Sequence, residues 1–188
     1  SQPVKIGLVG RFTAEKGHLQ LIECAKKIII ENKSDNYKFI FIGNETFGIS
    51  VLQDIKKKIT EYGIADYFEF TGFIENVIDY IKNRIDIIVI PSQREAFGRV
   101  ALEAWSARIP VIAFNIEGLA ELIDNNRTGV LVEKNNIDEL AAVIERLTLD
   151  AKLRARLIAN ASAELQNYDI SRTAASVRRL YYEILSKN

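Results

Sequence analysis

Two glutamates and the turn between them are the residues of this chain best placed to do chemistry. Glu95 and Glu103 stand on either side of Phe97-Gly98, with seven residues between them. The turn follows an apolar run, Ile85 to Ile90, which is typical of a buried strand. A helix that starts after the turn would present unpaired N–H groups, a natural place for a phosphate. Carboxylates accept hydrogen bonds from hydroxyls, so this segment could hold phosphates and the sugar hydroxyls next to them.

Two cations follow the first predicted strand. Arg11 and Lys16 lie five positions apart in the loop Gly10 to Gly17. Arginine offers a planar fork of donors and lysine a point charge, and together they suit a diphosphate. The loop is neither a Gly-x-Gly-x-x-Gly turn nor a P-loop, and alone it also fits two solvated surface cations. Because both loops follow strands at one sheet edge, we expect Arg11 and Lys16 to lie near Glu95.

Short apolar strands alternate with amphipathic helices along the chain. The predicted strands are Lys5–Val9, Lys38–Ile42, Phe68–Thr71, Ile85–Ile90, Pro110–Phe114 and Gly129–Val132. The predicted helices are Gly17–Glu31, Val51–Tyr62, Asn76–Asn83, Gly98–Ala107, Leu119–Asp124 and Ile137–Leu149. This alternation predicts an α/β fold, a Rossmann-like doubly wound parallel sheet of about six strands. Residues 151–188 have a helical pattern and are expected to form a C-terminal extension of two helices, broken near Asn167 to Asp169.

Length and composition are those of one globular domain. The chain has 188 residues, of which 48% are hydrophobic, enough to bury a core. Lys plus Arg and Asp plus Glu both number 25, and a formal net charge of zero argues against a general nucleic-acid binder. A small local basic site for one diphosphate stays compatible with that balance.

Histidine and cysteine offer little chemistry. The single Cys24 cannot form an internal disulfide and is expected to fill the core. One His and one Cys make no plausible zinc site. His18 follows Lys16-Gly17 and is expected at the surface near a helix start, not as a catalytic base.

No apolar run is long enough to cross a bilayer, and no signal peptide is visible. The chain opens at Ser1 without a Met and enters a strand at Val4, which favours a fragment cut at a domain boundary.

In order and spacing, the chain resembles the C-terminal, donor-binding domain of the retaining, GT-B-fold group 1 glycosyltransferases, which are family 4-like. The resemblance runs from about Val4 to the end. It rests on Gly10-Arg11, Glu15-Lys16-Gly17, Pro91-Ser92, Glu95-Ala96-Phe97-Gly98, Glu103-Ala104 and Pro110-Val111-Ile112-Ala113. It implies that residues 1–188 are one half of a GT-B fold whose N-terminal acceptor domain is absent.

The resemblance also implies roles for individual positions. Arg11 and Lys16 would bind the donor's diphosphate and stabilise the leaving group, while Glu95 would face the donor sugar and form the catalytic set with them. Glu103 would accept from the ribose hydroxyls. Phe73 alternatively reads as a core aromatic at a strand end. The other implied binding positions, largely through main chain, are Gly10, Gly72, Phe73, Ile74, Ala96, Phe97, Gly98, Arg99 and Val100.

Three positions depart from the family pattern. Glu117-Gly118 stands where many members have Gly-Gly, Gly43-Asn44-Glu45 replaces the usual Gly-x-Gly turn, and Ile170 replaces a common Trp. These departures leave the four residues Arg11, Lys16, Glu95 and Glu103 intact.

The implied activity is a retaining, hexosyltransferase-type transfer from a nucleoside-diphosphate sugar to an acceptor hydroxyl, with the isolated domain inactive. A UDP-sugar is the first expectation, with GDP- or ADP-sugar as alternatives, and the acceptor would be a sugar or a lipid-linked glycan of a cell-surface polysaccharide or glycoconjugate. No Asp-x-Asp motif is present, so neither a metal nor another cofactor is expected. The expected location is the cytoplasm, with peripheral attachment to the inner membrane face through the missing part as an alternative. The rival functions are a non-catalytic nucleotide-sugar-binding or regulatory module and a GT-B-type nucleotide-sugar epimerase.

Overall fold

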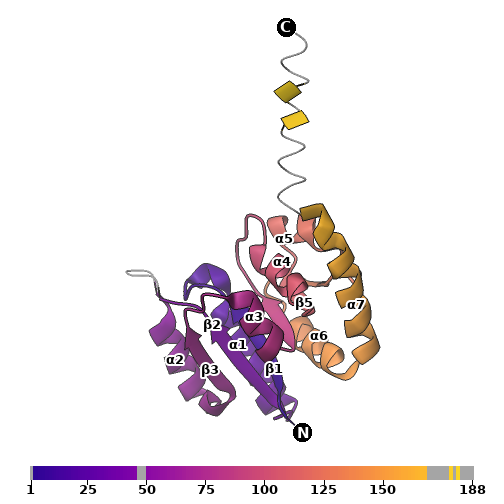
Figure 1. Cartoon of the computed structure of the whole chain (residues 1–188). Helices are drawn as coiled ribbons and strands as arrows, with labels where there is room; N and C mark the ends of the chain where they lie inside the picture. The colour runs from indigo at the N-terminus through magenta and orange to yellow at the C-terminus, as the bar shows by residue number, and fades with distance from the viewer. Residues whose placement is uncertain (1, 46–49, 169–177, 180, 183–188) are drawn as a thin grey trace.

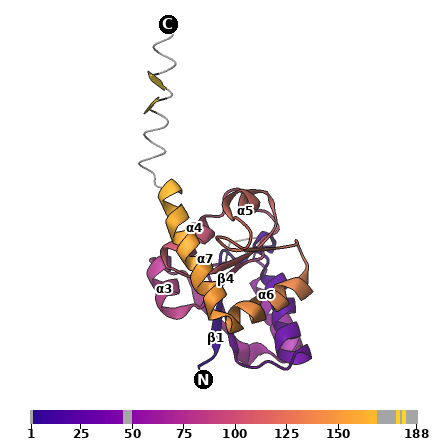
Figure 2. The same cartoon turned by 90° about the vertical axis from the view of Figure 1, so that its right-hand side faces the viewer.

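The computed structural model describes residues 2–45, 50–168, 178–179 and 181–182. Within them, six parallel strands form one sheet in the order β3-β2-β1-β4-β5-β6. Helices lie on both faces of this sheet (Figures 1 and 2). The predicted Rossmann-like, doubly wound fold is therefore confirmed. The strands are β1 Val4–Val9, β2 Tyr37–Ile42, β3 Phe68–Gly72, β4 Ile87–Ile90, β5 Val111–Phe114 and β6 Val130–Val132.

Two hydrophobic clusters sandwich the sheet. Successive side chains of a strand point to opposite faces, and β2 shows this directly. Phe39 and Phe41 pack in one cluster, whereas Ile40 and Ile42 pack in the other. The central strands are buried on both sides, which explains why the sequence of β4 is a continuous apolar run and not an alternating one.

The helices divide between the two faces. Helices α1 (His18–Lys26), α2 (Leu52–Glu61) and α6 (Ile137–Leu149) contribute to the cluster around Phe39 and Phe41. Helices α3 (Val77–Arg84), α4 (Arg99–Ser106) and α5 (Glu117–Leu122) cover the other face, and α7 (Ala151–Glu164) packs against both α4 and α6. Cys24 is fully buried in α1, as expected, and burial raises the pKa of its thiol.

Most predicted elements agree with the structure to within two residues. The last turn of the first predicted helix widens into a π-helical turn over Lys27–Glu31. Helix α5 begins earlier than predicted because the Ile116 carbonyl already accepts from the N–H groups of Leu119 and Ala120. After α7 the chain makes a 3-10 turn, Leu165–Tyr168. The second helix predicted for residues 151–188 falls largely outside the described residues.

The strand order sets where a ligand can reach the sheet. Strands β1 and β4 are neighbours in the middle of the sheet, and the chain order runs outward from them in both directions. The loops that leave their carboxyl ends therefore diverge, and this switch point is where open α/β sheets bind ligands.

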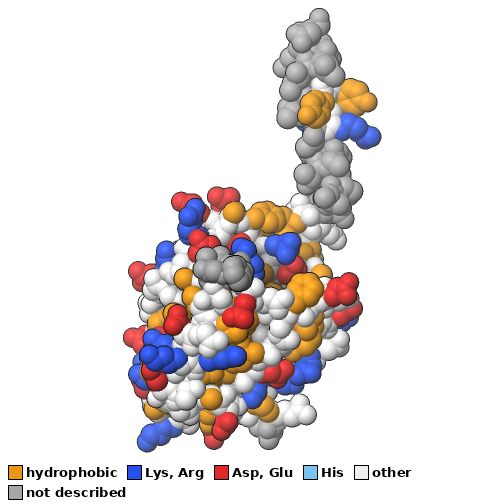
Figure 3. Space-filling model, turned by 90° about the vertical axis from the view of Figure 1, so that its left-hand side faces the viewer, with side chains coloured by type: hydrophobic (Ala, Val, Ile, Leu, Met, Phe, Trp, Pro, Cys, Tyr) orange, Lys and Arg blue, Asp and Glu red, His pale blue; other side chains and the backbone are white. Residues whose placement is uncertain are grey.

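The surface carries charges of both signs. Acidic and basic side chains of the described residues are intermingled on the face seen in Figure 3. Of the helices in the described part of the chain, none has both the length and the apolar character required to cross a bilayer.

Candidate functional site

The loops after β1 and β4 meet at the carboxyl ends of the strands. This end of the sheet is called the rim below. The Lys16 Nζ donates a hydrogen bond to the Glu95 Oε2 at 2.7 Å. The backbone joins the same two loops, because the Gln93 N–H donates to the Glu15 carbonyl at 2.7 Å. The expectation that Lys16 lies near Glu95 is thus confirmed. Arg11 is exposed in the same loop, directly after Gly10, whose N–H donates to the Ile42 carbonyl.

Two glycines allow this close approach. Gly17 has φ +74°, and a Cβ there would overlap the carbonyl oxygen of Pro91, the residue that follows β4. Gly118 lies in α5, where a Cβ would overlap the carbonyl oxygens of Glu95 and Ala96. The departure Glu117-Gly118 from the family pattern thus retains a glycine at the position that packs under the Glu95 loop.

Two helix N-termini open at this rim. Helix α1 starts after Gly17 and helix α4 after Gly98, and both glycines are N-caps in the left-handed region. A glycine has no side chain with which to cap, so it leaves the first N–H groups of each helix for water or a ligand. The dipoles of both helices add to the positive potential of Lys16 and Arg11. The combination suits a polyanion such as a diphosphate.

Lys16 and Glu95 shield each other partly from solvent. Their side chains are 23% and 17% exposed. Removing either partner would leave the other charge partly desolvated, which makes the pair costly to break unless a ligand replaces the lost contact. An anion that binds Lys16 supplies such a contact, and hydroxyl donors can do the same for Glu95.

Glu103 lies one turn inside α4 and pairs with the first residue of that helix. The Arg99 Nε donates to the Glu103 Oε1 at 3.1 Å, and the Glu103 side chain is 17% exposed while that of Arg99 is 85% exposed. Burial raises the pKa of the Glu103 carboxyl, and the charge and hydrogen bond of Arg99 oppose that rise. Helical side chains tilt toward the N-terminus, so Glu103 is directed back toward the rim. Val100, between these turns, is half-buried.

The loop after β3 lies two strands away from β1. Gly72 ends β3 in the left-handed region, and its carbonyl accepts from the Gly43 N–H at 3.0 Å. Neighbouring strands are about 4.8 Å apart, so this loop stands about 10 Å from β1, within the length of a nucleotide. Phe73 is 69% exposed, so its interpretation as a core aromatic is wrong. Ile74 is half-buried and packs on the cluster beneath α3 and α4.

A cavity of about 370 Å³ lies between the loops after β1, β2 and β3. Phe12, Asn44 and Phe70 line it together with Gly72. Gly72 was predicted as a binding position from the sequence, and the other three were not. Asn44 had a visible signal, since it follows the carboxyl end of β2, where loops reach the site.

Phe97 stands exposed at the rim beside Ala96. The Phe97 side chain is 53% exposed, and its ring centroid lies 6.3 Å from that of Tyr168, which follows α7. The same tyrosine ring lies 6.4 Å from the buried ring of Trp105 in α4. Tyr168 was predicted only as a helix break, because its contact with Phe97 joins elements far apart in the sequence.

His18 is a core residue, and the prediction of a surface position is wrong. Its side chain is 1% exposed, and its ring lies 4.9 Å from Phe12 and 5.0 Å from Phe41. Burial, followed by the nearby charge of Lys16, lowers the pKa of His18 from 6.5 to about 4. The signal was present in the sequence, because position 18 begins the buried stripe of α1 that continues at Leu21 and Ile22.

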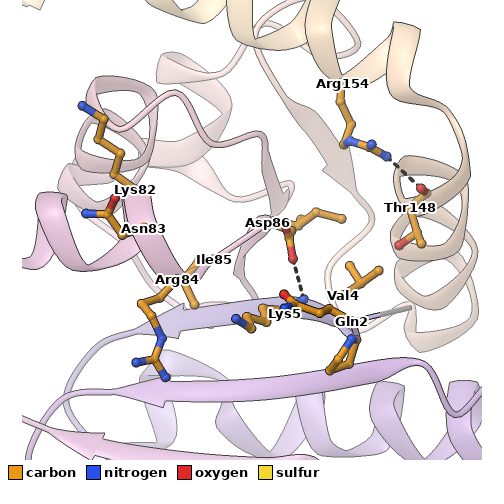
Figure 4. A pocket seen from close by; sticks show the side chains of 12 residues that line it. Gln2, Val4, Lys5, Lys82, Asn83, Arg84, Ile85, Asp86, Thr148 and Arg154 are labelled. Carbon is orange, nitrogen blue, oxygen red and sulfur yellow. Dashed lines mark hydrogen bonds between the residues drawn. The ribbon is translucent and has the colours of Figure 1, made fainter.

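A second cavity, of about 390 Å³, lies at the amino ends of the strands, opposite the rim (Figure 4). It carries several cations, but the C-terminal ends of α3 and α6 lie there, and their dipoles are negative. Arg154 donates to the carbonyls of Leu147 and Thr148, so it satisfies the end of α6. Asp86 accepts from the Lys5 N–H at 2.8 Å. Arg154 is thus engaged by the end of α6, and Asp86 by the start of β1.

Across residues 2–45, 50–168, 178–179 and 181–182, no group of three or more His, Cys, Asp or Glu side chains is placed to hold a metal ion.

The chain is similar in sequence to known proteins. The family model for glycosyl transferases group 1 matches residues 1–164. An alpha-D-kanosaminyltransferase of Streptomyces kanamyceticus is 31% identical over 180 residues, covering 94% of this chain and 45% of that protein. A capsular polysaccharide biosynthesis glycosyltransferase, CapM of Staphylococcus aureus, is 33% identical over 169 residues, covering 86% of this chain and 41% of that protein.

Solved structures show the same fold. Anabaena Alr3699/HepE in complex with UDP-glucose superposes with a TM-score of 0.83 at 25% identity, over 99% of this chain and 49% of that one. The chain thus spans about half the length of the relatives it matches. With the family match over most of its length, this chain belongs to the group 1 glycosyltransferases.

Proposed function

We propose that this chain binds a nucleoside-diphosphate sugar, with a UDP-sugar first, and forms the C-terminal donor half of a retaining glycosyltransferase. The observation that carries the proposal is the direct contact between Lys16 and Glu95 at the rim where α1 and α4 begin. Cations and helix amides there suit the diphosphate, and the carboxylates suit hydroxyls. UDP-glucose bound to the structurally similar Anabaena protein supports the choice of nucleotide.

The proposed reaction breaks the bond between the anomeric carbon and the diphosphate oxygen and forms a bond from that carbon to an acceptor oxygen. The electron pair of the broken bond stays on the diphosphate, and the acceptor hydroxyl passes its proton to the departing diphosphate oxygen. Arg11, Lys16 and the amides of α1 and α4 stabilise the developing negative charge, a role that needs no metal ion. When Lys16 binds the diphosphate in place of Glu95, the Glu95 carboxylate becomes available to accept hydrogen bonds from the sugar hydroxyls. Hexosyl transfer with retention belongs to this proposal.

The remaining parts of the reaction are assigned to a preceding N-terminal domain. That domain would bind the acceptor, a sugar or lipid-linked glycan in cell-surface polysaccharide or glycoconjugate synthesis, and would close over the donor. The 188-residue chain alone is then expected to bind nucleotide weakly and to transfer nothing. The proposed location is the cytoplasm or the inner face of the membrane.

Calorimetric titration of the chain with UDP, GDP and ADP tests the proposal. We expect heat of binding from at least one of the three, and loss of that heat in Lys16→Ala. The matched control is Lys152→Ala, which removes an exposed lysine of α7 away from the rim. Absence of binding heat from all three nucleotides would overturn the proposal, as would equal losses in the two variants.

A further inference from the structure

Arg99 is at a position where a cation is unfavourable for an isolated helix. It is the first residue of α4, at the positive end of the helix dipole. Its pairing with Glu103 also has the less favourable order, because an i,i+4 pair is stronger when the acidic residue comes first. Stabilisation of the helix therefore gives no reason for this arginine, which directs attention to what it does for its partner.

Glu103 needs a partner in order to act as an acceptor. Its carboxyl is largely buried, and burial favours the neutral form, which has one acceptor oxygen occupied by a proton. The contact from the Arg99 Nε engages one oxygen, Oε1, from the solvent side. The rest of the ionised carboxylate keeps its lone pairs for other donors. Two vicinal hydroxyls, as on a ribose, are such donors.

We propose that Arg99 is a positioning residue, which holds the Glu103 carboxylate in place as the acceptor for the vicinal ribose hydroxyls of the bound nucleotide. This inference rests on the proposed function. The Arg99 side chain acts through Glu103 and does not contact the diphosphate. The Arg99 guanidinium is held by Glu103, one turn further along α4. The amides at the start of α4 therefore stay open for the phosphates.

Several other titratable groups lie on the elements around α4. The titratable groups on the elements packed against α4, and on the loop before it, are Asp79, Tyr80, Lys82 and Arg84 of α3, Lys152, Arg154, Arg156 and Glu164 of α7, Tyr168, and Arg94 and Glu95. Within the described part of the chain, Arg99 is the group whose charge acts on Glu103. Removing Arg99 is therefore expected to raise the pKa of Glu103 further.

The test uses the 188-residue chain with UDP and 2′-deoxy-UDP as probes. The unaltered chain is expected to bind UDP more tightly than 2′-deoxy-UDP. Arg99→Gln is expected to weaken UDP binding about tenfold, the scale of one charge-assisted hydrogen bond, and to weaken the deoxy nucleotide less. A charge that acted on the diphosphate would instead weaken both nucleotides equally, which would overturn the inference.

The pH dependence of UDP binding is a second test, because a purely structural role of Arg99 would not change it. Binding of UDP should weaken at low pH as Glu103 gains a proton, and in Arg99→Gln this weakening should begin at a higher pH. Arg99→Lys should restore the original profile, and Glu103→Gln should remove this acid limb together with the preference for the ribose. Arg94→Gln is the matched control, since it removes an exposed arginine from the preceding loop.

The outcomes separate the two proposals. If the unaltered chain does not bind UDP, the UDP assignment of the proposed function is wrong and this inference with it. If UDP binds and Arg99→Gln changes neither the preference for the ribose nor the pH profile, the inference about Arg99 is wrong while the proposed function stands.

Discussion

Lys16 and Glu95 form an ion pair at 2.7 Å across 79 positions of sequence. Each residue belongs to a loop that leaves the carboxyl end of a central strand, and both side chains are partly buried. The pair joins the two kinds of group that a nucleotide sugar requires, a cation for phosphate and a carboxylate for hydroxyls.

In the complete enzyme of the proposed function, loss of either rim cation should impair transfer. Lys16→Ala or Arg11→Ala is expected to lower kcat/KM by more than about tenfold, because each removes a few kcal/mol of stabilisation of the leaving diphosphate. Steady-state kinetics with the donor sugar measure the effect, with Lys152→Ala as the control. Near-normal rates in both rim variants would rule out the assignment.

The approach of the two loops should depend on the absence of a side chain at position 17. Gly17→Ala is expected to destabilise the fold by more than about 2 kcal/mol, since it adds a clash with the Pro91 carbonyl to the cost of a left-handed backbone. Denaturant unfolding followed by circular dichroism measures the change.

Gly63→Ala is the matched control for position 17. Gly63 has a similar φ of +66°, but a Cβ there meets nothing within 4 Å. Only the backbone cost of about 1 to 2 kcal/mol should remain. Equal destabilisation by the two substitutions would show that contact with Pro91 does not matter.

His18 should make the fold sensitive to acid. Its pKa in the folded chain is about 4, below the ordinary 6.5, so the unfolded chain takes up more protons between these values. The stability that depends on neutral His18 is fully present above about pH 6.5 and is lost as the pH falls toward 4, by up to about 3 kcal/mol.

Thermal unfolding from pH 7 to pH 4 measures this dependence. His18→Leu and His18→Gln cannot take up the proton, so the difference in Tm from the unaltered chain should change across that range. Carboxylates titrate in all three proteins and cancel in the difference. A constant difference in Tm from pH 7 to pH 4 would contradict the prediction.

Local patterns in the sequence predicted much of the fold. Helix α6 has the predicted bounds, and the six strands agree closely because most of them are short, largely apolar runs between turn residues. The meeting of Lys16 with Glu95 was predicted from the rule that parallel strands end at one edge. What that rule could not supply is the ring packing of His18 between Phe12 and Phe41, which come from other elements.

Side-chain pairing at the site was harder to predict. The spacing of Arg99 and Glu103 was visible, but their pairing depends on how deeply α4 is buried against its neighbours, which sequence does not give. The contact of Phe97 with Tyr168 likewise depends on where α7 ends. The exposure of Phe73 could be decided only once the path of the loop after β3 was known.

The aromatic rings beside the rim have an optical consequence. The chain has a single tryptophan, Trp105, so its fluorescence has one source. Tyr168 stands between that indole and Phe97, which is exposed where the proposed donor would sit. We therefore expect occupancy of the rim to change the intrinsic emission, which would report binding with no dye attached.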